Sequence, residues 1–188
     1  MPKNIAIFAS GSGSNAENII RHFQNSEEFH FPIIVSNRLD APVHDRAKKL
    51  QVESVSFPRK DFETGEKILH LLNELEVDGI ILAGFLLKVP EVIVEAFPDK
   101  IINIHPALLP KYGGKGMYGD RVHQAVRGAG DTESGITIHF VNNQYDDGNI
   151  IFQAKCIVEP TDSYEDIARK VHLLEYEHFP KVIETIFG

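Results

Sequence analysis

The sequence has little cysteine and no long hydrophobic run. Cys156 is the only cysteine among 188 residues. The chain therefore cannot form an internal disulfide, and nothing in it requires an oxidising compartment. The longest apolar runs, at 80–83 and 85–87, fall far short of the roughly 20 residues that cross a bilayer. The first residues also lack the long apolar region and small-residue cleavage site of a signal peptide. These absences favour a cytoplasmic protein.

Basic residues are also in the minority. The chain has 19 Lys and Arg against 27 Asp and Glu, which gives a formal net charge of −8. Nonspecific nucleic-acid binding depends on a basic surface that neutralises phosphates, so the charge argues against it. The charge does not exclude a small anionic ligand, because binding of such a ligand depends on the local field and on backbone dipoles.

No internal repeat, low-complexity segment or Pro/Ser-rich linker divides the chain. Hydrophobic residues make up 43% and charged residues 24%, which is ordinary for a soluble globular protein. The length is close to the roughly 150 residues that are typical of one domain. We therefore expect residues 1–188 to form a single domain.

The first 106 residues alternate short apolar runs with amphipathic segments. This pattern predicts strands at 5–9, 31–36, 53–56, 79–82 and 101–105, with helices at 15–26, 41–50, 63–76 and 90–97. Near-continuous apolar strands separated by helices indicate a parallel sheet with helices on both faces.

The pattern changes after residue 106. A Gly/Pro-rich loop reaches residue 119, and a short helix is expected at 120–126. Strands at 135–141 and 149–157, joined by a polar stretch, are typical of an antiparallel hairpin with a long loop. A last helix is expected at about 164–186, capped by Asp162 or Ser163. The predicted fold is α/β, with a Rossmann-like parallel sheet and an antiparallel C-terminal part.

The loop 11–16 follows the first strand and opens the first helix. Its glycines allow a tight turn, and the exposed amides at the helix start suit a phosphate or another anion. An ordinary turn capped by Ser14 or Asn15 is the alternative. A dinucleotide site is a further alternative, but the second strand ends without the acidic residue that binds the ribose of NAD. Arg38 would suit only the extra phosphate of NADP.

Asn103 and His105 stand two residues apart at the end of the fifth strand, so they share one face of the sheet. An amide beside an imidazole can stabilise a carbonyl oxygen that acquires negative charge. A carboxylate reaching His105 from 146–148 would raise its pKa. Spacing alone, however, favours an ordinary turn at those residues.

Other motifs are absent or weak. The glycines at 113–116 do not form a Walker A loop, because no Ser or Thr follows Lys115. Neither cysteine pairs nor a His-Glu-x-x-His element supports zinc, and His172, Glu175 and His178 give only a weak metal signal. We expect no metal site. His139 lies opposite the apolar face of its strand and is expected only to pack or to meet solvent.

Five segments carry a family resemblance: Ser-Gly-Ser-Gly-Ser-Asn at 10–15, Leu-Ala-Gly-Phe at 82–85, Ile-Asn-Ile-His-Pro-Ala-Leu-Leu-Pro at 102–110, Gly-Ile-Thr-Ile-His-Phe-Val at 135–141 and Tyr-Asp-Asp-Gly at 145–148. Together they resemble the glycinamide ribonucleotide formyltransferases, the folate-dependent enzymes of purine synthesis. The resemblance runs essentially from end to end, and the Asn-x-His-Pro-x-x-Leu-Pro block is its most specific part.

The resemblance implies a catalytic set of Asn103, His105 and Asp146. The glycinamide amine would attack the formyl carbon of 10-formyltetrahydrofolate, which serves as a co-substrate. His105, as imidazolium, and the Asn103 amide would stabilise the tetrahedral oxyanion. Asp146 would keep His105 charged and assist proton transfer.

The resemblance also implies two binding sites for small molecules, with neither nucleic acid nor membrane as a partner, in a monomer or homodimer. The ribonucleotide site would contain Gly13, Ser14, Asn15, Asn103 and Glu175. The folate site would contain Leu86, Leu87, Lys88, Val89, Asn142, Asn143, Gln144, Tyr145 and Asp146.

Two departures from the family pattern concern the folate tail. Leu87 stands where many relatives have an arginine, and a second usual arginine has no clear counterpart at 64–65, although Arg59 and Lys60 lie upstream. The loop 111–119 also differs from the shorter form expected. Related enzymes with an added domain, formyltetrahydrofolate deformylase and methionyl-tRNA formyltransferase, are disfavoured by the length of 188 residues.

Overall fold

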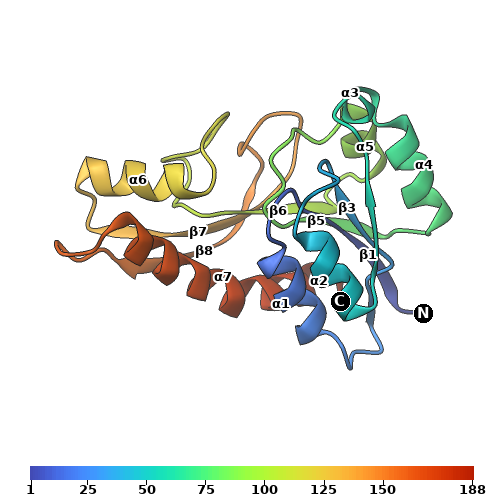
Figure 1. Ribbon diagram of the computed structural model, residues 1–188, viewed down its shortest axis with the longest axis horizontal. Helices are drawn as coiled ribbons and strands as arrows, with labels where there is room; N and C mark the ends of the chain where they lie inside the picture. Colours follow the sequence, from blue (N-terminus) through green and yellow to red (C-terminus); the bar gives the residue numbers. More distant parts are fainter.

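The computed structural model describes all 188 residues and contains one mixed sheet (Figure 1). Its strands are β1 (Lys3–Phe8), β2 (Phe29–His30), β3 (Ile33–Ser36), β4 (Glu53–Ser56), β5 (Gly79–Leu82), β6 (Ile101–His105), β7 (Glu133–Phe140) and β8 (Ile150–Ile157). The strand order is β4-β3-β1-β5-β6-β7-β8, and the short β2 pairs with β1. Pairing is parallel from β4 to β6 and antiparallel from β6 to β8, as predicted.

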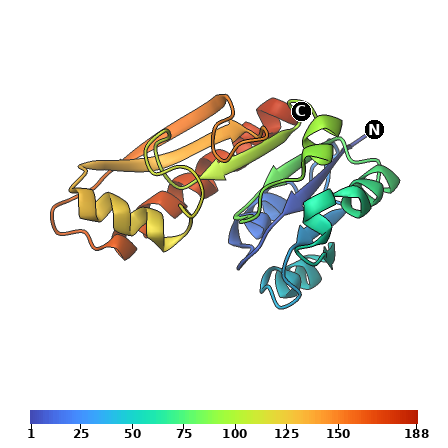
Figure 2. The same cartoon turned by 90° about the horizontal axis from the view of Figure 1, so that it is seen from above.

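Seven helices accompany the sheet. They are α1 (Ser14–His22), α2 (Val43–Leu50), α3 (Asp61–Thr64), α4 (Glu66–Glu74), α5 (Glu91–Ala96), α6 (Asp120–Ala129) and α7 (Tyr164–Phe187). None of them is long and apolar enough to cross a membrane. Figure 2 shows α6 beside the β7–β8 hairpin, apart from α3 and α4, which lie with the parallel strands.

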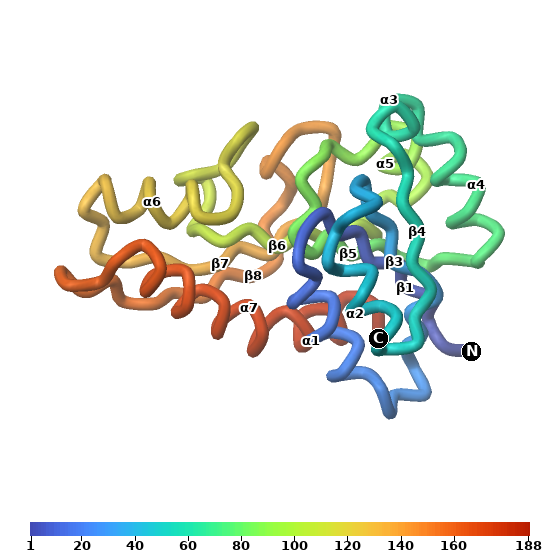
Figure 3. Tube along the Cα trace, in the orientation of Figure 1, coloured from blue at the N-terminus to red at the C-terminus, as the bar shows by residue number.

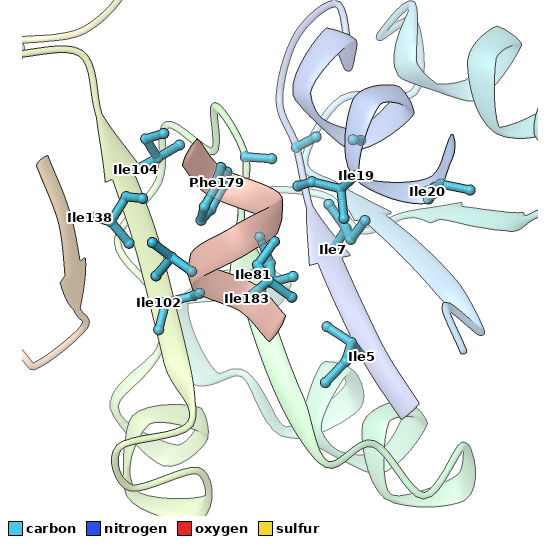
Figure 4. Close-up of a cluster of buried hydrophobic side chains, with 14 of the residues drawn as sticks. Ile5, Ile7, Ile19, Ile20, Ile81, Ile102, Ile104, Ile138, Phe179 and Ile183 are labelled. Atoms are coloured by element: carbon cyan, nitrogen blue, oxygen red, sulfur yellow. The ribbon is translucent and has the colours of Figure 1, made fainter. Parts of the chain in front are cut away.

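The parallel strands bury both of their faces. Along β1, Ile5 and Ile7 point into a cluster with α1, α2 and α7, whereas Ala6 and Phe8 point into a second cluster with α3, α4 and α5. Figure 4 shows part of the first cluster, with Ile81 close to Ile183 of α7. This double burial explains why the strands are near-continuously apolar in sequence.

The C-terminal helix connects the two parts of the molecule. It begins at a capping box, in which the Ser163 hydroxyl accepts from the Asp166 amide and the Asp166 carboxylate accepts from the Ser163 amide. From there α7 runs along the β7–β8 hairpin to α1 (Figures 1 and 3). It therefore brings side chains from the end of the sequence to the loop after β1.

Several boundaries differ from the predicted ones, and one difference changes an element. The single helix predicted at 63–76 is wrong, because Gly65 separates α3 from α4 with a φ of 76°. A Cβ at this position would lie 2.5 Å from Pro90 Cβ and 2.8 Å from Val92 Cγ1. The close approach of the chain that leads into α5 therefore requires glycine.

Gly65→Ala should destabilise the protein by about 2–4 kcal/mol, because it combines a left-handed alanine with an overpacked contact. Gly128→Ala in α6 is the matched control, since nothing lies within 4 Å of the added Cβ. That substitution should stabilise the protein by about 0.5–1 kcal/mol. Urea unfolding of both variants measures the difference, and equal stabilities would contradict this account of the break.

Candidate active site

The carboxyl ends of the parallel strands open onto a cavity of about 590 Å³. Its walls come from the loop after β1, the segment after β5, the end of β6, the loop before α6 and the middle of α7. This is the edge at which open α/β sheets bind their ligands.

The loop after β1 contributes Gly11 to Asn15 to the cavity. Gly13 caps α1 with a φ of 73°, and a Cβ there would lie 2.3 Å from Val43 Cγ2. The Arg46 guanidinium donates to the Ser12 carbonyl at 2.7 Å, and the Val43 amide donates to the Gly11 carbonyl at 3.2 Å. Helix α2 thus packs against this loop and fixes its path.

The end of β6 places Asn103 and His105 on the same face, as predicted. Ile102 and Ile104 point the other way into the core. The side chain of His105 is 5% exposed, and its Nε2 lies 2.7 Å from the Tyr112 carbonyl oxygen. Because a carbonyl can only accept, Nε2 carries the hydrogen. The other ring nitrogen, Nδ1, lies 3.6 Å from Asp146 Oδ2.

Asp146 reaches the strand from the loop between β7 and β8. Its Oδ2 accepts from the Gly114 amide at 2.9 Å, and its Oδ1 lies 3.6 Å from His139 Nε2. Burial alone would raise the pKa of this carboxyl, but the nearby His139 and His105 rings and the Gly114 amide together outweigh burial and hold the pKa below its usual value. The carboxylate is therefore charged at neutral pH.

His139 packs, as one of its two predicted alternatives has it, but it also contacts a candidate catalytic residue. Its side chain is buried, and Nδ1 lies 2.7 Å from the Phe140 carbonyl oxygen, so Nδ1 donates. The unprotonated Nε2 then accepts from the Asn103 side-chain amide at 3.1 Å. This contact follows from the antiparallel pairing of β6 with β7, which places His139 directly opposite Asn103.

The expected direction of the His105 pKa was wrong. The negative charge of Asp146 does raise this pKa, but burial of the ring has the larger, opposite effect and leaves the pKa below its usual value. His105 is therefore neutral at neutral pH. Its Nδ1 can take up a proton next to a carboxylate.

The wall formed by α7 is also polar. Glu175 is buried and accepts from the Asn15 side-chain amide at 3.0 Å, while His172 Nδ1 lies 2.8 Å from the same carboxylate oxygen. The hydrogen bond with Glu175 raises the pKa of His172. His123 of α6 is buried at the same wall, its Nδ1 has no partner, and burial lowers its pKa.

Some, but not all, of the residues predicted to bind the two substrates line the cavity. Every residue predicted for the ribonucleotide lines it: Gly13, Ser14, Asn15, Asn103 and Glu175. Of those predicted for the folate, Leu86, Leu87, Tyr145 and Asp146 line it, whereas Lys88, Val89, Asn142, Asn143 and Gln144 do not. Sequence reasoning had assigned no role to His123, His172 or the segment 114–119, which also line the cavity.

Comparison of this chain with known protein families identifies the class of protein that the fold and the site define. Residues 3–183 match the family model described as formyl transferase. The chain therefore belongs to the formyl transferase family, as its motifs indicated.

Within that family, the chain is similar to phosphoribosylglycinamide formyltransferases. The Haemophilus influenzae protein of that name is 38% identical over 97% of this chain and 86% of its own length. The Bacillus subtilis protein is 35% identical over 99% of this chain and 95% of its own. A chloroplastic relative from Arabidopsis thaliana is 37% identical over 98% of this chain, which spans only 65% of that relative.

Solved structures agree with the predicted fold. Glycinamide ribonucleotide transformylase 1 from Geobacillus kaustophilus superposes with a TM-score of 0.90 at 33% identity, with all of both chains covered. Phosphoribosylglycinamide formyltransferase from Streptococcus pneumoniae gives a TM-score of 0.86 at 34% identity, again over all of both chains.

Asp146→Asn should lower the pKa of His105 further, because the substitution removes the negative charge that opposes the effect of burial. Titration of the histidine ring signals by NMR measures this shift. Asp147→Asn makes the same change one residue away on an exposed side chain and should leave the His105 titration in place. An unchanged or higher pKa in Asp146→Asn would contradict the assigned contact.

Proposed function

We propose that this protein transfers the formyl group of 10-formyltetrahydrofolate to the amine of 5-phosphoribosylglycinamide, a step of purine biosynthesis. The observation that carries the proposal is the cluster of Asn103, His105 and Asp146 in one cavity with the anion-binding loop, in a chain of the formyl transferase family. The proposed partners are these two small molecules.

The first step is attack of the amine nitrogen on the formyl carbon. A C–N bond forms, and the carbonyl electrons move to the formyl oxygen. Asn103 has one amide hydrogen directed to His139 and a second available for this oxyanion. Because His139 fixes the Asn103 amide, the donor is already oriented when the charge develops.

His105 manages the proton. The neutral ring accepts the proton released by the amine at Nδ1, next to the charged Asp146 carboxylate. The imidazolium so formed adds a positive charge near the oxyanion. Collapse of the intermediate breaks the bond from the formyl carbon to N10, and the proton passes to that nitrogen to release tetrahydrofolate. In this scheme His105 becomes the imidazolium during the reaction rather than beginning as one.

The two substrates are assigned to opposite parts of the cavity. The backbone amides of Gly13, Ser14 and Asn15 at the start of α1 suit the ribonucleotide phosphate. Glu175 lies beside Asn15 and is assigned to the glycinamide end. The donor is assigned to the segments 86–89 and 142–146, of which Leu86, Leu87, Tyr145 and Asp146 line the cavity.

The proposed function requires that tetrahydrofolate be released only when phosphoribosylglycinamide is present. Mixing the protein with 10-formyltetrahydrofolate, with and without the amine, and recording the absorbance change of the folate tests this. Equal release without the amine would indicate transfer to water and would replace the transferase with a deformylase.

His105→Ala should lower turnover by about 10²-fold or more, with little change in the KM for the ribonucleotide.

Gly13→Ala should raise the KM for the ribonucleotide by at least about tenfold. The added methyl collides with Val43 and strains a left-handed residue, so the loop must move from the path that presents its amides. Gly11→Ala is the control in the same loop, since nothing lies within 4 Å of its added Cβ, and its effect should be much smaller. Steady-state kinetics with each substrate varied in turn would separate the two sites. An equal effect of both substitutions would contradict the role of Gly13.

A further inference from the structure

Ser10 lies at the point where the ends of three strands meet. It stands two residues beyond the end of β1 and is fully buried. Its amide donates to the Gly84 carbonyl, just beyond β5, at 3.1 Å. A buried hydroxyl costs free energy unless it is hydrogen bonded, so the partners of the Ser10 side chain are informative.

The Ser10 hydroxyl joins two residues that line the cavity. It donates to Asn37 Oδ1 at 2.5 Å and accepts from the Leu86 amide at 2.9 Å. Asn37 follows β3 and Leu86 follows β5, and both line the cavity, whereas Ser10 does not. Since a hydroxyl donates once and accepts through two lone pairs, both bonds can exist together.

These bonds give each wall residue a defined orientation. The side-chain oxygen of Asn37 is used by Ser10, which leaves the Asn37 Nδ2 as a donor at the cavity wall. The amide of Leu86 is used by the Ser10 hydroxyl, which fixes the backbone where the segment enters the cavity. Ser10 thus acts on the cavity through its neighbours.

Aromatic contacts also hold the same segment. Phe85 is buried, with its ring centroid 5.4 Å from that of Phe8 and 5.3 Å from that of Phe62. Its neighbour Leu86 is 41% exposed. Phe85 therefore fixes the depth of the segment, while Ser10 fixes the direction of the backbone at Leu86.

We propose that Ser10 is a positioning residue for the formyl donor. Its hydroxyl holds the wall formed by Asn37 and Leu86 in the conformation that binds the folate, without contacting the folate itself. This inference rests on the proposed function, which assigns the segment after β5 to the donor. The anion loop has its own supports, Val43 and Arg46. Loss of the Ser10 hydroxyl should therefore affect the donor and spare the ribonucleotide.

Ser10→Ala should raise the KM for 10-formyltetrahydrofolate by about tenfold, since it leaves the Leu86 amide and the Asn37 oxygen without their partner. The kcat and the KM for the ribonucleotide should stay within about twofold of wild type. Ser36→Ala is the matched control. Ser36 is also a fully buried serine, at the end of β3, but its hydroxyl accepts only from the Arg38 amide within its own turn. All three kinetic parameters should be unchanged in that variant.

A parallel rise of both KM values in Ser10→Ala would show a merely structural role and overturn the proposal, as would an unchanged donor KM. If Ser10→Ala does not fold, Asn37→Ala removes the acceptor of the same hydroxyl from a less buried position and should raise the donor KM selectively. An unchanged donor KM in Asn37→Ala would then overturn the proposal.

The double variant gives a further check, because two substitutions acting through one hydrogen bond are not additive. Ser10→Ala/Asn37→Ala should raise the donor KM by less than the product of the two single effects, and a fully multiplicative rise would overturn the proposal. Calorimetric titration with tetrahydrofolate keeps the inference separate from the reaction. Weaker tetrahydrofolate binding in Ser10→Ala than in wild type supports the role of Ser10 even if amine-dependent turnover is absent, and equal affinities overturn it.

Discussion

The site depends on the largely buried carboxylate of Asp146, whose side chain is 13% exposed. From the loop between β7 and β8, Asp146 contacts three other segments: His105 at the end of β6, His139 in β7 and the Gly114 amide before α6. A largely buried charge is costly unless it is hydrogen bonded, and the Gly114 amide supplies such a bond while the two imidazole rings favour the ionised carboxyl. The same requirement brings the chemical groups together. One arrangement of these segments thus both stabilises the carboxylate and gathers the candidate catalytic groups.

Backbone carbonyls decide which ring nitrogens carry protons around that carboxylate. Tyr112 holds the hydrogen of His105 on Nε2, and Phe140 holds the hydrogen of His139 on Nδ1. As a consequence, the unprotonated ring nitrogen of His105 faces Asp146, and the unprotonated ring nitrogen of His139 faces the Asn103 amide. In the proposed mechanism the two histidines therefore differ, because His105 can accept a proton while His139 supports the Asn103 donor. Main-chain geometry sets this difference, so it cannot be predicted from the amino-acid composition.

Sequence periodicity predicted what depends on neighbouring residues. The strands at 53–56, 79–82 and 101–105 have the predicted bounds, and the alternation along β6 places Asn103 and His105 correctly. Contacts between distant segments were harder to predict. The break at Gly65 results from the approach of Pro90, and the position of Asp146 results from a loop whose spacing fits any turn. The net direction of the His105 pKa was misjudged because strand alternation does not reveal how deeply the ring is buried, and burial outweighs the effect of Asp146.

The net charge of −8 does not determine the field at the loop after β1, because two acidic groups near it, Glu17 and Glu175, have basic partners. Glu17, in the first turn of α1, pairs with Arg21 and Arg46, and hydrogen bonds from these arginines lower its pKa. Arg46 also donates to the Ser12 carbonyl, so one side chain both orients the loop after β1 and pairs with a nearby carboxylate. On α7, the raised pKa of His172 favours a positive charge beside Glu175, which accepts from Asn15. These pairings limit the repulsion that the proposed anion would meet at the loop amides, where the dipole at the start of α1 favours it.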